Sequence, residues 1–148
     1  MSNKKGFSLL ELVLAIALFS LGSFTLASMI IDSGISTQIN TDRINSLLYT
    51  KEGVEAVFSI RDLNWSNLVE GEYYLDHSSG AWILATASEP TDYIISDTKY
   101  RRVVTIISSS TAPYIKGASV NVSWSQNSGR ISSTTQSILL SNWQSITN

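Results

Sequence analysis

An uncharged apolar segment near the N-terminus limits the folds that this chain of 148 residues can adopt. No charged residue occurs between Leu12 and Ile31, and Glu11 is the only one between Phe7 and Ile31. A helix needs about 20 apolar residues to cross the roughly 30 Å of hydrocarbon in a bilayer. The segment therefore predicts a helix that lies in a membrane or in an apolar bundle, outside any soluble core.

Glu11 is the residue of this segment that needs a separate explanation. A carboxylate costs roughly 2.5–3.5 kcal/mol at the centre of a membrane on insertion scales, and less near the interface. The apolar segment itself offers no cation to compensate it. A cleaved signal peptide, with an apolar core of about 7–15 residues, is shorter than this segment. A plain single-span anchor fits the length but leaves Glu11 unexplained. Both alternatives stand beside a third.

The third interpretation is based on the order of residues at the start of the segment. Lys-Gly-Phe-Ser-Leu-Leu-Glu, followed by the apolar segment, resembles the prepilin motif of type IV pilins and type II secretion pseudopilins. The resemblance implies that a prepilin peptidase cuts between Gly6 and Phe7, which makes residues 1–6 a leader peptide. It also implies that Phe7 is then methylated at its new N-terminus, and that Glu11 meets the N-terminal amine of a neighbouring subunit.

The proposed pairing of Glu11 with an amine is physically reasonable. An amine and a carboxylate compensate one another in a low-dielectric bundle, whereas either charge alone is costly. Glu11 lies four residues after Phe7, which is about one helical turn, or roughly 6 Å. A neighbouring subunit displaced along the axis by about this distance brings its amine to Glu11. We therefore expect one buried charge pair to set the register between subunits.

Composition and charge narrow the expected partners. The formal net charge is −2 and no basic stripe runs through the chain, so nucleic acid is not expected as a main partner. Lys4 and Lys5 predict a cytoplasmic N-terminus and an exported C-terminal part. The chain has no cysteine, which excludes a disulfide and a thiolate metal site. Many major pilins have a disulfide, and a proline where this chain has Ser28, so both differences favour a minor pilin or a pseudopilin.

The helical pattern continues beyond the apolar segment but becomes amphipathic. We expect residues 7–31 to form the apolar half of one long helix, which projects and serves membrane anchoring and assembly. Residues 32–148 are expected to form a globular α+β domain, and the helix is expected to extend to residue 62. Its second half has an apolar stripe predicted to pack on the rest of this domain: Ile35, Ile39, Leu47, Leu48, Val54, Val57 and Phe58.

After residue 68 the pattern changes to short strands. Residues 72–76 and 81–86 flank a polar turn and predict a hairpin. Further strands are predicted at residues 99–108, 118–125 and 130–141, and a short one at 93–95, from their β-branched residues and alternation. Helix first and sheet second predicts an α+β fold, with the long helix against four or five antiparallel strands.

Two groups of residues have side chains that can take part in catalysis or metal binding. His77, the only histidine, follows Asp76 in a predicted turn and is expected to be solvated. A hydrolase would instead need a pocket that joins His77 to an acid and a serine. Glu89, Asp92 and Asp97 fall in one predicted loop, for which a hydrated acidic loop is expected and calcium binding is the alternative. We expect no catalytic residue, no metal and no cofactor.

Two other patterns have simple interpretations. The basic cluster of Lys99, Arg101 and Arg102 is expected at a solvated strand edge, where charge discourages association between sheets. Asn64 and Asn121 each fit the short acceptor pattern for glycosylation, which also recurs by chance.

The sequence thus supports two main hypotheses. In the first, the chain is a structural subunit, a minor pilin or pseudopilin, of a type IV pilus or a related secretion or DNA-uptake filament. Its partners would be the prepilin peptidase, the inner membrane before assembly, and other pilin or pseudopilin subunits. It would cross the membrane once before entering a filament at the cell surface or in the periplasm. In the second, it is a membrane-anchored extracytoplasmic binding module that forms no filament. An enzyme is not expected.

Overall fold

The computed structural model describes residues 8–96, 98–126 and 129–143. The chain divides into two compact units, residues 1–41 and residues 42–148. The helix α1 (Leu9–Leu63) begins in the first unit and ends in the second. The long helix predicted for residues 7–62 is therefore confirmed from Leu9 onward.

In the first unit, α1 is the element that the structure describes, and every described side chain up to residue 41 is exposed. The large apolar side chains between Leu9 and Ile31 are 57–79% exposed. A free helix with this surface is not stable in water, because burial of apolar area is the main source of stability in a folded chain. This segment therefore requires lipid or other protein around it.

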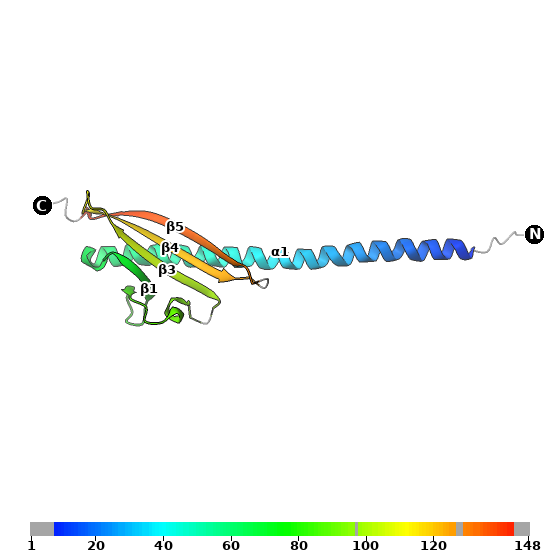
Figure 1. The fold of residues 1–148 in the computed structure, drawn as a ribbon, viewed down its shortest axis with the longest axis horizontal. Coiled ribbons are helices and arrows are strands. Elements are labelled where there is room, and N and C mark those ends of the chain that lie inside the picture. Colours follow the sequence, from blue (N-terminus) through cyan, green and yellow to red (C-terminus); the bar gives the residue numbers. More distant parts are fainter. Residues whose placement is uncertain (1–7, 97, 127–128, 144–148) are drawn as a thin grey trace, which may run out of the picture. The chain divides into compact units, whose positions relative to one another are not determined.

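The second unit contains an antiparallel sheet, as predicted (Figure 1). The strand order is β2-β1-β3-β4-β5, and every neighbouring pair is antiparallel. The strands are β1 (Gly71–Asp76), β2 (Ile83–Ala85), β3 (Tyr100–Ser108), β4 (Ile115–Ser125) and β5 (Ile131–Ser141). The α+β fold class is thus confirmed.

Two short 3-10 helices connect these elements. After α1, Asn64 caps η1 (Trp65–Asn67) by accepting a hydrogen bond from the backbone N–H of Ser66. The second, η2 (Pro90–Tyr93), lies between β2 and β3, and its side-chain caps come from Glu89 and Asp92. The strand predicted at residues 93–95 does not form, because Tyr93 ends η2 and only Ile94 makes an isolated bridge, to Arg101.

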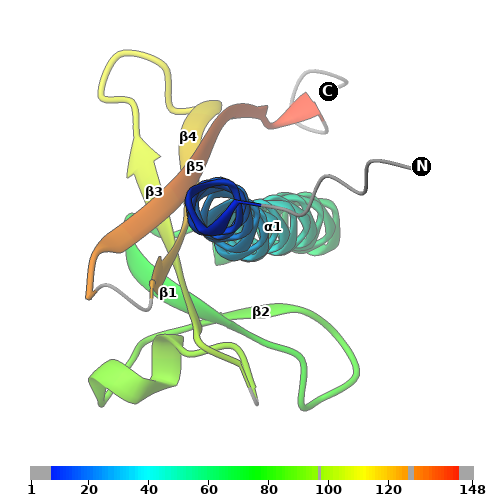
Figure 2. The same ribbon diagram turned by 90° about the vertical axis from the view of Figure 1, so that its right-hand side faces the viewer.

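The core of the second unit lies between the C-terminal part of α1 and the inner face of the sheet, which curves around this part of the helix (Figure 2). Alternation along the strands sends every second side chain inward. The fully buried side chains include Val57 and Ile60 from α1 and Val104, Val120 and Leu140 from the sheet. Gly53 allows the close approach, because a Cβ at this position would lie 2.8 Å from Cγ1 of Val120.

The prediction that the apolar stripe of the helix packs on the rest of the domain is wrong for four of its residues. Val54 and Val57 are buried and Phe58 is partly buried, but Ile35, Ile39, Leu47 and Leu48 are 43–60% exposed. The sheet instead contacts a face of α1 that is polar or small before residue 54. Hydrophobic periodicity alone selects the wrong face here, because the sheet supplies polar partners to this part of the helix.

The predicted edge position of the basic cluster is also wrong, because Arg101 and Arg102 both lie on a strand in the centre of the sheet. Arg102 is only 6% exposed and lies on β3, the central strand of the sheet. Its neighbour Arg101 points to the opposite face and is exposed, in keeping with strand alternation. Burial of Arg102 is possible because Nη1 binds the Glu52 carboxylate at 3.2 Å and the Tyr49 carbonyl at 3.3 Å.

Candidate functional site

The apolar segment of α1 is the first candidate site. Backbone hydrogen bonds from Glu11 and Leu12 to the Ser8 carbonyl start the helix. α1 is long and apolar enough to cross a membrane, as judged by length and composition. Three hydroxyl groups of the apolar segment bond within the helix: Ser20 donates to the Ile16 carbonyl, Thr25 to the Gly22 carbonyl and Ser28 to the Thr25 carbonyl. Such internal bonds suit a helix in an apolar environment, where water cannot serve as partner.

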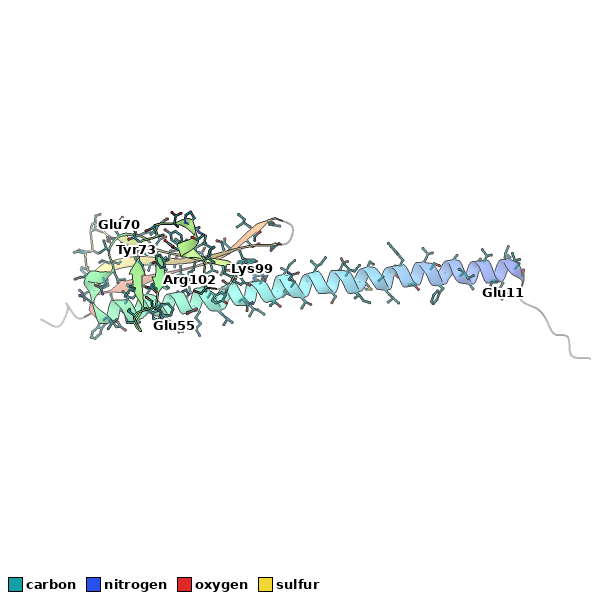
Figure 3. All side chains as sticks on the ribbon, turned by 90° about the horizontal axis from the view of Figure 1, so that it is seen from below. Glu11, Glu55, Glu70, Tyr73, Lys99 and Arg102 are labelled. Atoms are coloured by element: carbon teal, nitrogen blue, oxygen red, sulfur yellow. The ribbon has the colours of Figure 1, made fainter. Side chains whose placement is uncertain are left out.

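Glu11 lies in the first turn of α1 and is exposed (Figure 3). A carboxylate in this position interacts favourably with the helix dipole. Within the described residues, its side chain forms no hydrogen bond or ion pair. The nearest apolar neighbours on the helix, Leu10 and Leu12, are 73% and 57% exposed. Glu11 is therefore an isolated acid on a surface that otherwise requires apolar contact.

The apolar surface continues into the second unit. Ile44, Leu47 and Leu48 are 57%, 51% and 60% exposed, although the folded domain has already begun at Asp42. Positions three and four apart lie on one face of a helix, so these three side chains form one patch. We call Ile44, Leu47 and Leu48 the outer patch. An exposed apolar cluster of this kind indicates an interaction surface.

The opposite face of the same turns is polar and buried. Asp42, Ser46 and Thr50 are 7%, 0% and 1% exposed. Spaced four residues apart, they lie in one row, and Gly53 continues the same face. Over these turns the usual distribution of side chains is reversed, because polar side chains face the sheet and apolar side chains face away from it.

The buried polar row is fully paired. The Asp42 carboxylate accepts a hydrogen bond from the Tyr100 hydroxyl at 3.0 Å and forms an ion pair with the Lys99 ammonium group at 2.7 Å. The Ser46 hydroxyl lies 2.9 Å from the Thr134 hydroxyl on β5, and Thr50 donates to the Ser46 carbonyl. Because buried polar groups are tolerated when they are hydrogen-bonded, this face is fixed in place and the outer patch remains outside.

The N-terminal segment also matches a known family model. Residues 1–27 match the model described as the prokaryotic N-terminal methylation motif. The chain carries a prepilin-type methylation motif. Neither the comparison with curated proteins nor the comparison with solved structures gives a match. The motif and the long helix with its antiparallel sheet are consistent with a type IV pilin-like protein.

The methylation motif includes three residues singled out from the sequence. Gly6 and Phe7, the predicted cleavage and methylation positions, lie outside the residues that the structure describes. Glu11 is described, and its position in the first helical turn leaves its carboxylate accessible to a partner. The role of Glu11 in assembly stays a prediction.

A cleft in the second unit contains His77. It has a volume of about 450 Å³ and lies between α1, the β1–β2 turn and η2. His77 is exposed, and its ring lies against Trp82 with centroids 4.7 Å apart. The Ser78 hydroxyl donates to the Asp76 carboxylate at 2.7 Å instead of to His77. The three residues thus line one cleft, but their hydrogen bonds form a turn and not a nucleophile–base pair.

The Asp76 carboxylate stabilises this turn. It accepts hydrogen bonds from the hydroxyl and the backbone N–H of Ser78, and these bonds hold the pKa of Asp76 below its usual value. Arg102 also lines this cleft, and the central carbon of its guanidinium lies 5.7 Å from the centroid of the Trp82 ring. Burial lowers the pKa of Arg102, and the neighbouring Glu52 carboxylate acts in the opposite direction.

The acidic loop has a structural role at the residues that are described. One Asp92 carboxylate oxygen accepts hydrogen bonds from the backbone N–H groups of Ser88 and Glu89. Asp97 lies outside the described residues. In the described part of the chain, no three acidic or histidine side chains form a group that could hold a metal ion.

The two glycosylation patterns differ in their surroundings. Asn64 is exposed and caps η1, whereas Asn121 on β4 donates to the Thr135 hydroxyl at 2.7 Å. Asn121 is therefore held within the sheet surface, and Asn64 is the more accessible of the two.

Sequence reasoning missed the buried polar row and its partners. The predicted packing face of the helix does not include Asp42, Ser46 and Thr50, although their four-residue spacing is visible in the sequence. A regular row of small and polar residues that ends at a glycine is a usable signal for close packing on a sheet. Their partners Lys99 and Thr134 lie more than fifty residues away, and no local pattern indicates them.

Proposed function

We propose that the chain is a structural subunit, a minor pilin or pseudopilin, of a type IV pilus or a related secretion or DNA-uptake filament. In this proposal a prepilin peptidase removes residues 1–6, and Phe7 becomes the methylated N-terminus. The subunit is held in the inner membrane with its N-terminus in the cytoplasm, and then joins other pilin or pseudopilin subunits through α1. Its role is structural and not enzymatic.

The observation that carries this proposal is the methylation motif over residues 1–27, with Glu11 in the first turn of the helix that follows. A span that only anchors a domain has no use for an acid at this position, because charge opposes insertion. An acid that meets the amine of another subunit explains both its presence and its location. Its exposure in the described structure supports an intermolecular partner.

The outer patch gives independent support. Ile44, Leu47 and Leu48 lie beyond the apolar segment, on a helix face that the protein's own sheet leaves free. Bilayer contact ends with the apolar segment, so lipid does not explain a patch within the folded unit. Contact with the helices of neighbouring subunits does explain it, because apolar side chains that are exposed in a monomer become buried on association.

The first test is the chemistry of the N-terminus. The mature protein, isolated from cells that have the processing enzyme, is expected to begin at methylated Phe7, as measured by intact mass and N-terminal peptide sequencing. Gly6→Val is expected to block cleavage and to retain residues 1–6. A mature chain that begins at Met1, or one that begins after Ile31, would contradict the proposal.

The second test separates assembly from membrane insertion. Glu11→Gln keeps the size of the side chain and removes its charge, so we expect normal membrane insertion but loss of the protein from sheared filaments. Glu55→Gln is the matched control, because Glu55 is an exposed acid on the C-terminal part of the same helix and is paired weakly with Lys51 (Figure 3). Equal incorporation of the two variants would contradict the role of Glu11.

The cleft of about 450 Å³ beside Trp82 favours one alternative, a membrane-anchored binding module. This alternative predicts an uncleaved N-terminus and no effect of Glu11→Gln on activity at the cell surface. The same two measurements therefore separate the two functions.

A further inference from the structure

The cleft beside Trp82 opens where β1 separates from β3. β1 pairs with β3 over Gly71–Tyr73, and from Tyr74 to Asp76 it pairs, within the described residues, with β2 alone. Lining side chains also come from η2, from the segment after it and from α1. Every lining residue that the structure describes belongs to the folded unit of residues 42–148, so the cleft does not depend on the apolar segment. Its volume of about 450 Å³ is typical of small-molecule sites.

Arg102 supplies the cleft with a nearly buried cation whose guanidinium is only partly hydrogen-bonded. Its side chain is 7% exposed and reaches from β3 to α1 (Figure 3), where Nη1 binds the Glu52 carboxylate at 3.2 Å and the Tyr49 carbonyl at 3.3 Å. A guanidinium has five N–H donors, and within the described residues Nε and Nη2 bond to no acceptor. Among the described side chains, Nε1 of Trp124 is the atom that lacks both a partner and contact with solvent. The remaining Arg102 donors are therefore accessible from the cleft.

The charges around the cleft favour a neutral ligand. Three carboxylates line it, those of Glu52, Asp76 and Asp92, so with His77 neutral the lining carries more negative than positive charge. This excess of negative charge repels an anion. A cation would compete with Arg102 for the Glu52 carboxylate and would lie beside a like charge in a nearly buried position.

A sugar has the polar groups that this lining requires. A hydroxyl both donates and accepts hydrogen bonds, so neighbouring ring hydroxyls can accept from the Arg102 guanidinium and donate to the Glu52 carboxylate. Hydrogen bonds to ionised groups are stronger than those between neutral groups. A peptide segment offers one backbone donor per residue along an extended chain, and so fits three carboxylates around one cleft less well.

Aromatic side chains form another part of the cleft wall. Tyr74, Trp82 and Tyr93 line the cleft, and each is partly exposed. The central carbon of the Arg102 guanidinium lies 5.7 Å from the centroid of the Trp82 ring, so the polar and aromatic parts of the wall adjoin. Aromatic rings offer an apolar surface to the C–H groups of a sugar ring. Such a surface beside a few convergent polar groups is the usual composition of a small-molecule site.

We propose that this cleft binds a neutral saccharide. Ring hydroxyls bond to the Arg102 guanidinium and the Glu52 carboxylate, and the apolar side of the sugar packs on the aromatic wall at Trp82. The inference goes beyond the proposed function. It applies to a filament subunit and to an anchored module, because the cleft lies within residues 42–148 in both cases.

The direct test is a titration of the purified full chain with simple sugars, followed by tryptophan fluorescence. The detergent must have no sugar headgroup. The neutral probes are the methyl glycosides of glucose, galactose and mannose, together with N-acetylglucosamine. Glucuronate and protonated glucosamine are the charged probes of similar shape, and acetyl-trialanine amide is the peptide probe. We expect saturable binding of at least one neutral sugar with a Kd of about 1 mM or lower, and binding of the charged and peptide probes at least about tenfold weaker.

Two pairs of variants locate the binding in this cleft. Glu52→Gln removes a carboxylate of the lining, and Glu55→Gln is the matched control on the same helix, outside the cleft. Arg102→Lys removes the guanidinium, whereas Arg101→Lys keeps a cation beside Tyr93 on the opposite face of β3. We expect both cleft variants to raise the Kd by about tenfold and both controls to change it by less than about twofold. Circular dichroism checks that each variant is folded, and Glu52→Gln remains decisive if Arg102→Lys does not fold.

The outcomes separate this inference from the proposed function. Absence of saturable binding by all four neutral sugars, stronger binding of a charged or peptide probe, or an unchanged Kd in Glu52→Gln would overturn the inference. None of these results affects the filament proposal, because the titration uses the isolated chain. Conversely, sugar binding by a protein that is absent from sheared filaments would support the cleft and contradict only the filament proposal.

Discussion

The Asp42 carboxylate accepts a hydrogen bond from the Tyr100 hydroxyl at 3.0 Å, across 58 positions of the sequence. Lys99, the residue before Tyr100, adds an ion pair to the same carboxylate. Asp42 is the first residue of the second unit, so this contact fastens the start of the folded domain to the sheet. It also sets the rotation of α1, which decides that the outer patch faces away from the sheet.

We expect Asp42→Ala to destabilise the second unit by about 1–3 kcal/mol, because the Tyr100 hydroxyl loses its acceptor in a buried position. Lys99 is partly exposed and can return to water, so its loss of a partner adds little. The measurement is denaturant unfolding followed by near-ultraviolet circular dichroism. Asp62→Ala is the control, since Asp62 pairs with Arg61 at the surface, and its effect is expected to stay below about 0.5 kcal/mol.

The pH dependence of stability should reveal the buried Tyr100 hydroxyl. Burial raises the pKa of Tyr100 above its usual value of 10.0, and the nearby Asp42 charge adds to this effect. The folded state therefore holds the proton more tightly than the unfolded state. The stability linked to Tyr100 is complete below pH 10 and decreases as the pH rises from about 10 through the folded-state pKa. Denaturant unfolding between pH 8 and 11 should show a steeper loss in the unmodified protein than in Tyr100→Phe; equal slopes would contradict this assignment.

Gly53→Ala should destabilise the second unit. The new Cβ would lie 2.8 Å from Cγ1 of Val120 and 3.2 Å from Cδ of Arg102, so helix and sheet must separate. Overpacking of this kind costs about 1–3 kcal/mol. Gly34→Ala is the matched control on the same helix, because nothing lies within 4 Å of its Cβ position, and it should leave the thermal midpoint of the sheet-containing unit unchanged. A neutral Gly53→Ala would show that the contact between helix and sheet is looser than described.

The outer patch should matter for assembly and not for folding. Leu47→Gln and Leu48→Gln remove apolar surface that the folded unit leaves exposed, so the unfolding transition should move little. Incorporation into filaments should decrease, because association would bury both side chains. Lys51→Gln, one turn further along, is the control on an exposed polar position. A large loss of thermal stability in Leu47→Gln would show that the side chain belongs to the core.

Local patterns were sufficient for most elements. Alternation of β-branched residues located β3, β4 and β5 because each strand has one buried face, and uninterrupted periodicity located α1. The rotation of α1 was not accessible in this way, because it depends on Tyr100 and Thr134, which are distant in sequence from Asp42 and Ser46. The burial of Arg102 was missed for the same reason, since its partner Glu52 belongs to the helix.

At the candidate site, the short motif around Glu11 was recognisable because its meaning lies in the order of adjacent residues. The outer patch was not recognisable, since Leu47 and Leu48 have the same spacing as core residues and only the observed packing separates the two cases. Hydrophobic periodicity shows which helix face is apolar. It does not indicate whether that face is buried by the same molecule or by another one.

The exposed outer patch of α1 affects the design of a soluble fragment of the protein. A fragment of residues 42–148 would lack the apolar segment but would still expose Ile44, Leu47 and Leu48 to water. Replacing this isoleucine and the two leucines with polar residues, rather than shortening the fragment further, would keep the contact of Asp42 with the sheet and remove the exposed apolar surface.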